Sequence, residues 1–334
     1  MKLLLVVASL VLAAVRPVAA EPQELRVATL APAGTPWMDL LERSAAEIAD
    51  KTEKRITIKY YGGGQQGDER DYIAKIKLGQ LDGAALTALG LSQIEPSILV
   101  LQLPLLFTTQ EEVDYVATQM WPYFRAKFEK RGFRLGERGE IGWVYFFSKE
   151  KVTTLAELRK QKLPTLSDDQ LASTISDKLK VQGVPLGVPE IDAALTSGRI
   201  NACFSSPLGA IALQWYRKVK YMSSTPMVYA IGATVMSLEV AKKVSADDQK
   251  LVEAIAKRSQ KKARALIRKG NEDARALLLR KNIVVVEPSK EMVDQLTAIA
   301  AEVQRELTGK LYSKEELEMV IAHRDEYRAK QATR

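Results

Sequence analysis

The chain has 334 residues, of which 46% are hydrophobic and 27% are charged, and its formal net charge at pH 7 is +8. A chain of this length and composition is expected to form a globular protein of about two domains. Its single cysteine, Cys203, excludes an intramolecular disulfide, and its single histidine, His323, leaves little for Ser-His-Asp catalysis or a histidine metal site.

The N-terminus has the pattern of a secretory signal peptide. Lys2 gives a positive start, an apolar run covers residues 3–15, and small residues at 18–20 offer a cleavage site. A buried N-terminal helix is the alternative, and it is disfavoured because no polar face accompanies the apolar run. The rest of the chain has no stretch of about 18 apolar residues that would span a membrane. We therefore expect residues 1–20 to be removed and the mature protein to be exported and soluble.

Strands and helices alternate over residues 25–87. Residues 25–30 predict a short buried strand, and apolar residues over 37–48 recur at helical spacing along one face. Residues 55–60 alternate polar and apolar as a half-buried strand does, and Asp68 is placed to cap the helix that follows. This order predicts βαβ units with parallel strands, whose carboxyl ends are where open α/β sheets bind their ligands.

The middle of the chain predicts a second α/β region. Residues 139–148 read as a strand, 154–158 as a capped helical turn, 190–197 as a helix and 200–204 as another strand. Cys203 lies in the last of these, an apolar run, which indicates a buried and inert thiol.

A long helix is predicted from Ser245 to Leu279. About 35 helical residues span roughly 50 Å, more than the width of one small domain, so this helix is expected to lie across both domains. Gly270 within it tolerates a bend or kink. Basic residues gather at 257–269, but no aromatic residue occurs between residues 229 and 312. Because single-stranded nucleic acid is bound by basic and aromatic residues together, we interpret these charges as a solvated helix face and expect no nucleic-acid partner.

A glycine loop at 62–67 suggests a different function. Its sequence, Gly-Gly-Gly-Gln-Gln-Gly, fits the G-x-G-x-x-G pattern of dinucleotide-binding folds, and Asp82 follows at a suitable distance. The loop, however, follows the second predicted strand and not the first. Asp68 also caps the helix N-terminus that would hold the pyrophosphate and would repel it. A plain turn that leads into a capped helix is the preferred interpretation, and we expect no cofactor.

Several segments together resemble a known family. These are Leu-Arg-Val-Ala-Thr-Leu-Ala-Pro at 25–32, Tyr-Tyr-Gly-Gly-Gly-Gln-Gln-Gly-Asp-Glu at 60–69 and Ile-Lys-Leu-Gly-Gln-Leu-Asp-Gly at 76–83. With further matches at 103–107, 155–163, 194–201 and 206–208, the chain resembles the solute-binding proteins of TRAP (tripartite ATP-independent periplasmic) transporters, of the DctP type. The resemblance covers essentially the whole mature chain in the right order.

The resemblance implies a periplasmic receptor without catalytic activity. It implies an α/β two-domain clamshell with a long helix spanning both domains, which captures a small molecule for TRAP membrane permease subunits. The expected first domain comprises residues 21–141 plus 232–271, and the second comprises 142–231 plus 272–334. Segments at 142–147 and 212–215 resemble a subgroup with a tetratricopeptide-repeat partner lipoprotein, so that partner is implied as well.

The chain departs from the family where the ligand is usually anchored. An arginine that binds organic acids is replaced by Pro164, and a second arginine on the crossing strand is matched by Val144. Positions that carry amide or acidic groups in relatives are matched by Leu30, Thr87 and Ser206. Proline and valine cannot replace the planar fork with which arginine binds a carboxylate. We therefore expect an apolar, hydroxyl-lined site for a neutral or hydrophobic ligand, although Arg138, Arg159, Lys160 and Lys162 remain alternative anchors.

The candidate ligand-binding residues combine these positions with aromatic side chains and hydroxyls near the predicted cleft. They are Leu30, Trp37, Thr87, Trp143, Tyr145, Thr165, Ser167, Phe204, Ser206 and Tyr229. Two other functions remain open. One is an exported enzyme that binds a nucleotide cofactor at residues 62–67, and the other is a carrier that hands a hydrophobic molecule to a partner without any permease.

Overall fold

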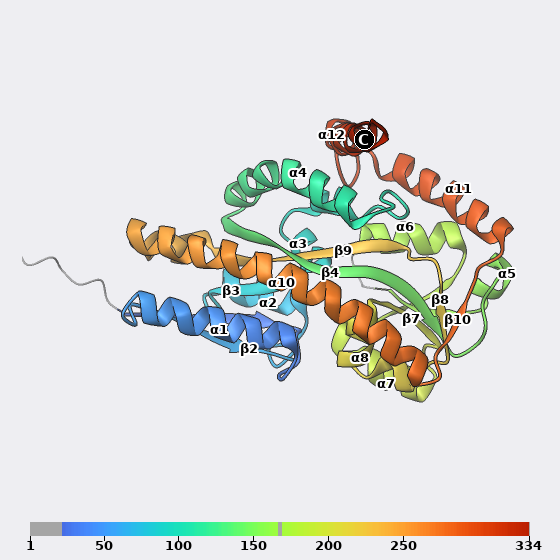
Figure 1. Ribbon diagram of the computed structural model, residues 1–334, viewed down its shortest axis with the longest axis horizontal. Coiled ribbons are helices and arrows are strands. Elements are labelled where there is room, and N and C mark those ends of the chain that lie inside the picture. The colour runs from blue at the N-terminus through green and yellow to red at the C-terminus, as the bar shows by residue number, and fades with distance from the viewer. Residues whose placement is uncertain (1–21, 166–168, 334) are drawn as a thin grey trace, which may run out of the picture.

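The computed structural model describes residues 22–165 and 169–333. The expected signal peptide, residues 1–20, and the candidate site residue Ser167 lie outside these ranges. Within them the chain forms two lobes that share one large mixed sheet, with helices on both sides (Figure 1). The prediction of an α/β clamshell is confirmed.

The first lobe is built from parallel βαβ units, as the sequence predicts. Strand β1 (Gln23–Thr29) pairs in parallel with β2 (Ile56–Tyr61) on one side and β3 (Gly83–Thr87) on the other. Helix α1 (Pro36–Lys51) connects β1 to β2, and α2 (Glu69–Lys77) connects β2 to β3. The predicted cap of α2 is present, because Asp68 Oδ1 accepts the backbone N–H of Glu69 at 2.8 Å. The Asp68 backbone N–H in turn donates to Asp71 Oδ2 at 2.7 Å, which completes a capping box.

In the described part of the chain the large sheet has eight strands, in the order β10-β8-β4-β9-β3-β1-β2 with β7 on β4. The strands beyond the first three are β4 (Phe133–Ser148), β7 (Ala202–Ser205), β8 (Tyr221–Ser223), β9 (Val228–Ser237) and β10 (Val284–Val286). A separate pair is formed by β5 (Lys162–Thr165) and β6 (Gln182–Pro185), which run parallel.

Strand β4 belongs to both lobes. Its first part pairs antiparallel with β9 up to Val144, and its last residues pair with β7 and β8. The register with β9 shifts between Glu140 and Gly142, and Gly142 has a φ of +104°, a left-handed conformation that favours glycine. The crossing strand is therefore irregular where it leaves the first lobe.

The remaining elements are mainly helices that cover the sheet. They are α3 (Ala88–Ser92), α4 (Gln110–Lys130), α5 (Leu155–Leu158), α6 (Gln170–Leu179), α7 (Ile191–Ser197), α8 (Pro207–Ala212), α9 (Leu238–Lys243), α10 (Ala246–Arg280), α11 (Lys290–Leu307), α12 (Lys314–Ala332) and the 3-10 turns η1 (Pro96–Gln102), η2 (Val188–Glu190) and η3 (Trp215–Arg217). Among the described residues no helix is long and apolar enough to cross a membrane.

Helix α10 confirms the prediction of a long helix that spans both lobes. It has 35 residues, and Ser245 caps it by accepting the Asp248 backbone N–H at 3.1 Å. It packs against α1 in the first lobe, crosses β4, and ends beside α8 in the second lobe (Figure 1). Gly270 has a packing role, since a Cβ atom there would stand 3.2 Å from Leu208 Cδ2 of α8.

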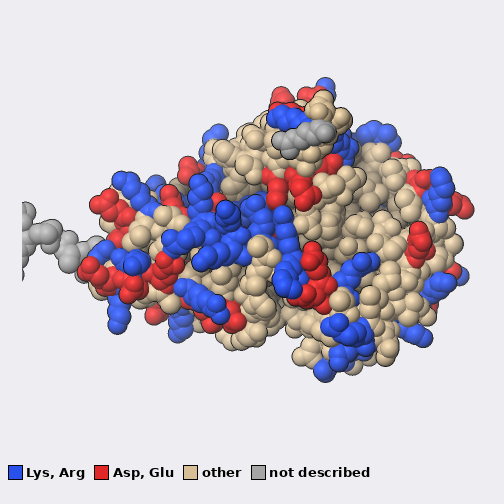
Figure 2. All heavy atoms as spheres, viewed as in Figure 1, with Lys and Arg blue, Asp and Glu red and all other residues tan. Residues whose placement is uncertain are grey.

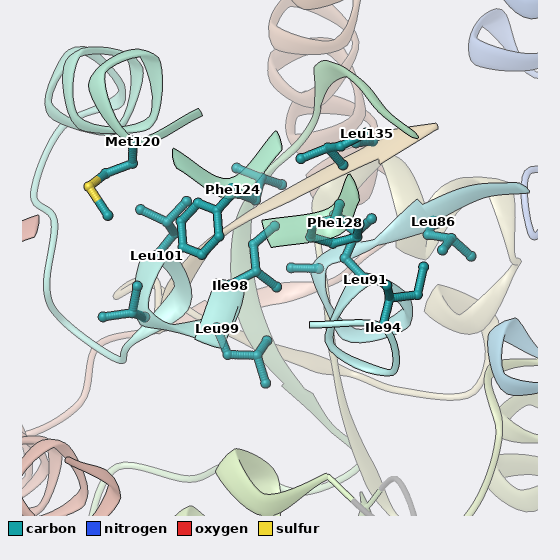
Figure 3. Packing of buried hydrophobic residues seen from close by; sticks show 14 of the residues in the cluster. Leu86, Leu91, Ile94, Ile98, Leu99, Leu101, Met120, Phe124, Phe128 and Leu135 are labelled. Atoms are coloured by element: carbon teal, nitrogen blue, oxygen red, sulfur yellow. The ribbon is translucent and has the colours of Figure 1, made fainter. Parts of the chain in front are cut away.

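The main core lies where α4 and η1 cover the first lobe. Figure 3 shows Phe124 and Phe128 of α4 pointing toward Ile98, Leu91 and Leu135 from three different elements. All five side chains are buried. At about 1.5–3 kcal/mol for each large side chain removed from water, this cluster holds α4 firmly on the sheet.

Many charged residues of α10 are exposed, whereas Arg268 faces the sheet, where it pairs with Glu140 of β4. Figure 2 shows Lys and Arg gathered on the face where Figure 1 places α10, with acidic side chains next to them. Arg258 pairs with Glu47 of α1, and Arg268 pairs with Asp114 of α4 at 2.8 Å. The basic run is thus partly balanced by ion pairs, as a solvated helix face would be.

Candidate functional site

A large cavity lies between the lobes, with a volume of about 680 Å³. The first lobe contributes the loop after β1, the start of α1 and the end of β3. The second lobe contributes β5, α6 and α8, while β4, β9, α10 and α11 complete the walls. The volume falls within the roughly 300–1,000 Å³ of cavities that hold small molecules.

Six of the candidate residues line this cavity together. They come from both lobes and from six different elements or loops: Leu30, Trp37, Thr87, Thr165, Phe204 and Ser206. Most of them stand at or just beyond the carboxyl end of a strand, which is where open α/β sheets are expected to bind their ligands.

Three aromatic candidates lie elsewhere. Trp143, Tyr145 and Tyr229 are not among the described residues that line the cavity. The rings of Trp143 and Tyr229 stack edge to face with centroids 4.9 Å apart, and Tyr229 is buried in the main core. The cause is strand alternation: Val144 lines the cavity and its neighbours on β4 point to the opposite face, and on β9 Val228 and Ala230 flank Tyr229 in the same way.

The two positions at which relatives are expected to carry arginine do face the cavity. Pro164 and Val144 both line it, and so does Leu163 beside them. No Lys, Arg or His occurs among the described residues of the lining. The basic residues considered as alternative anchors lie outside it: Arg138 donates to Asp114, and Arg159 Nε donates to the Leu179 carbonyl at 3.1 Å.

Three carboxyl groups line the largely apolar cavity, and the sequence did not point to any of them. Glu69 is the first residue of α2 and is buried. Its Oε1 accepts the backbone N–H of Thr87 at 2.6 Å, and its Oε2 accepts the Thr87 hydroxyl at 2.7 Å. Burial raises the pKa of Glu69 to about 7, although the hydrogen bonds from Thr87 act in the opposite direction.

The other two carboxyl groups have structural partners. Arg268 of α10 donates to both oxygens of Glu140, from Nε to Oε1 at 2.7 Å and from Nη2 to Oε2 at 3.2 Å, and the Tyr229 hydroxyl also donates to this carboxylate. Asp169 caps α6, with Oδ1 accepting the Leu171 N–H at 2.9 Å. Burial raises the pKa of both carboxyl groups.

The lobes touch each other at the edge of the cavity. A Cβ atom on Gly64, in the glycine loop of the first lobe, would stand 3.2 Å from Pro189 Cγ in the second lobe. The structure therefore represents a closed arrangement. The same loop has a structural role, since a Cβ atom on Gly67 would collide with Asp71 Oδ2, a member of the α2 capping box.

Many of the apolar walls could not be assigned from the sequence. Helices α6 and α11 contribute an aliphatic surface, and Trp215 of η3 also lines the cavity: Leu171, Ile175, Leu179, Leu296, Ile299, Ala300, Val303 and Trp215. In sequence these residues look like the buried faces of ordinary amphipathic helices. In the described part of the chain no group of three or more His, Cys, Asp or Glu residues is arranged to hold a metal ion. A closed, largely apolar cavity with a few polar groups is suited to reversible binding of a small molecule.

Comparison with known proteins agrees with this architecture. A sequence model of the family described as bacterial extracellular solute-binding protein, family 7 (DctP), matches residues 27–310. The uncharacterized protein YiiZ of Salmonella typhimurium is 22% identical over 233 residues, which are 67% of this chain and 69% of that protein.

Solved structures share the fold at low sequence identity. The sugar acid binding protein DctPAm from Advenella mimigardefordensis, in complex with galactonate, has a TM-score of 0.86 at 20% identity and covers 92% of this chain and 99% of its own. A TRAP periplasmic solute binding protein from Xanthobacter autotrophicus, with bound β-D-galacturonate, has a TM-score of 0.84 at 20% identity. The match covers 90% of this chain and 99% of that protein's chain.

Two lobes, a cavity between them and a helix across both define a clamshell receptor for a small molecule. The match extends over most of the chain. This protein belongs to family 7 of the bacterial extracellular solute-binding proteins, the DctP family of TRAP transporter receptors. The family resemblance seen in the sequence is confirmed.

Proposed function

We propose that this protein is a periplasmic receptor that captures a small neutral or hydrophobic molecule and delivers it to a TRAP-type secondary transporter. The proposed ligand class rests on one observation. The cavity is largely apolar, and Pro164 and Val144 line it at positions where the family resemblance leads us to expect a carboxylate-binding arginine. The ligands named for the related structures, galactonate and β-D-galacturonate, are acids. This chain differs from such receptors in ligand chemistry while it keeps their fold.

Energetics support the exclusion of carboxylates. A hydrogen bond to a charged group contributes about 1.5–3 kcal/mol, and a buried carboxylate without a partner also keeps its desolvation penalty. Glu69, Glu140 and Asp169 line the same cavity, and any of them that is ionised repels an anion. Since about 1.4 kcal/mol is a tenfold change, a sugar acid should bind at least about two orders of magnitude more weakly than an apolar molecule of similar size.

Capture is proposed to work by lobe closure. A ligand that contacts both lobes stabilises the closed state relative to the open one. We place the domain boundaries at residues 21–141 plus 232–271 and 142–231 plus 272–334. The register shift of β4 at Gly142 supports this division, and so does Asn271 of α10, whose Nδ2 donates to the Ile141 carbonyl at 2.9 Å.

The partners follow from family membership. Receptors of this family act with TRAP membrane permease subunits, and we propose the same for this chain. The segments at 142–147 and 212–215 are the basis for proposing a tetratricopeptide-repeat lipoprotein as a second partner. We propose that the protein has no catalytic role of its own.

Native mass spectrometry of the purified protein tests the ligand class. We expect a co-purified molecule without a carboxylate, released on denaturation and identifiable by its mass. Calorimetry with galacturonate on the ligand-free protein is the matched measurement, and we expect no binding at micromolar concentrations. Tight binding of galacturonate or of a C4-dicarboxylate would overturn the proposal.

A further inference from the structure

The cavity contains carboxyl groups and no cation among its described residues, which makes it an unusual environment for an apolar ligand. Of the three carboxyl groups, Glu140 is held by Arg268 on both oxygens and by the Tyr229 hydroxyl. Asp169 accepts the backbone N–H groups of Leu171 and Ala172 as the cap of α6. Both therefore have a structural role that accounts for their burial.

Glu69 differs from these two. It is buried, and in the described part of the chain no Lys, Arg or His forms an ion pair with it. Its partners are the backbone N–H and hydroxyl of Thr87, one on each oxygen, and the backbone N–H of Gly90. An ionised carboxylate has about four acceptor positions, so three donors leave Glu69 capacity for one more. A ligand in the cavity, which Glu69 and Thr87 both line, can supply that donor.

We propose that the ligand of this cavity is an amphipathic molecule with an apolar body and a hydrogen-bond-donating head group, and that Glu69 binds this head group. An ammonium group fits best, because it supplies both the donor and the missing positive charge. The apolar body lies against the aliphatic walls of α6 and α11. This inference rests on the proposed function of the cavity as a site for a neutral or hydrophobic molecule, and it adds the chemistry of the polar end.

The chemistry favours this arrangement over a purely apolar ligand. A buried carboxylate without a counter-charge is destabilising, and a ligand ammonium compensates it. An alcohol donates one hydrogen bond to the same carboxylate but brings no charge. A carboxylate head group brings repulsion. The same hydrocarbon with these three head groups should therefore bind in the order amine, alcohol, acid.

Competition binding on the mature chain tests this order. The neutral fluorophore N-phenyl-1-naphthylamine serves as the probe, and decylamine, 1-decanol and decanoate are the competitors, all below their micellar concentrations. We expect decylamine to displace the probe at a concentration at least about tenfold lower than decanoate, with 1-decanol between them. Decanoate that competes as well as decylamine overturns the inference, and this ranking needs no variant.

Two variants assign the effect to Glu69. In Glu69→Gln the advantage of decylamine over 1-decanol should fall to within about threefold, because the charge is removed while an acceptor oxygen remains. Asp248→Asn is the matched control, a buried carboxyl that lies outside the cavity lining, and it should leave the ranking intact. An advantage that survives Glu69→Gln, or that is lost in Asp248→Asn, overturns the assignment.

The outcomes also separate this inference from the proposed function. If the probe binds and all three competitors displace it equally, only the head-group inference fails. If neither the probe nor any competitor binds the ligand-free protein, the cavity is not a hydrophobic site, and both proposals fail.

Discussion

Gly187 in the second lobe lies so close to Asp68 in the first that a Cβ atom on Gly187 would stand 2.6 Å from Asp68 Oδ2. The backbone of Gly187 is extended, with φ −78° and ψ 160°, so any residue can adopt its conformation. A larger residue at position 187 would therefore have to displace the Asp68 side chain. Because Asp68 caps α2 in the first lobe, this close approach exists only when the lobes are shut.

Replacing Gly187 should therefore hold the lobes apart. Gly187→Val places side-chain atoms where Asp68 stands in the closed form, and we expect a larger radius of gyration by small-angle scattering in the presence of ligand. Affinity for an apolar probe should fall, since the open form loses the contacts of one lobe. Adding Asp68→Gly, a replacement that weakens a helix cap by only a few tenths of a kcal/mol, should restore closure. Full closure and unchanged affinity in Gly187→Val would contradict the clamshell mechanism.

The buried carboxyl of Glu69 makes stability depend on pH in a definite direction. Its pKa rises from 4.5 to about 7 on folding, so it stabilises the folded state below about pH 4.5 and loses this contribution as pH rises through 7. At about 1.4 kcal/mol per pH unit the full loss is about 3 kcal/mol. Urea unfolding of ligand-free protein should show Glu69→Gln gaining about this much relative to the wild type between about pH 4.5 and pH 8.

Asp248 provides a control, because its pKa shift, and therefore the pH dependence of stability that it causes, has the opposite sign to that of Glu69. A hydrogen bond from Arg55, with Nη2 2.9 Å from Asp248 Oδ1, lowers the pKa of this carboxyl. Its contribution is present above the unfolded pKa and is lost as pH falls, so Asp248→Asn should lose stability relative to the wild type as pH rises. A pH-independent difference between Glu69→Gln and the wild type would show that Glu69 does not titrate in this range.

The fold could be predicted from local patterns, and the site only in part. Capping residues and apolar spacing identified α1, α2 and α10, and the family resemblance led to Leu30 and Thr87, which line the cavity. Aromatic character misled the choice on β4, where alternation and the register shift decide which side chains face the cavity. Glu69 was missed because an acidic residue in the first turn of a helix is the ordinary complement of the helix dipole. The walls from α6 and α11 depend on long-range packing that no local pattern contains.

Two tryptophans should respond differently to truncation. Trp37 lines the cavity, whereas Trp143 stacks on the buried ring of Tyr229. We expect Trp37→Ala to weaken binding of an apolar probe by about tenfold or more with little loss of stability. We expect Trp143→Ala to lower the free energy of unfolding by about 3 kcal/mol, as large-to-small core changes do, with affinity nearly unchanged. Fluorescence titration and urea unfolding of both variants check this, and a loss of affinity confined to Trp143→Ala would place the ligand on the other face of β4.

The most direct test of ligand chemistry is to return a cation to the cavity. Pro164 lines it from β5, and the resemblance to relatives puts an arginine at this position. In Pro164→Arg the guanidinium can donate two parallel hydrogen bonds to a carboxylate, contributing about 1.5–3 kcal/mol or roughly ten- to a hundredfold in affinity. Galacturonate should then bind detectably by calorimetry, while binding of an apolar probe weakens.

Pro164→Met is the length-matched control without a charge, and it should bind neither galacturonate nor any other acid. It also reports the effect of losing the proline ring, because both variants restore a backbone N–H to β5. Circular dichroism should confirm that both are folded before binding is compared. If the wild type already binds galacturonate as tightly as Pro164→Arg does, then the apolar residue at position 164 does not set the ligand class. The anchor must in that case lie elsewhere in the cavity.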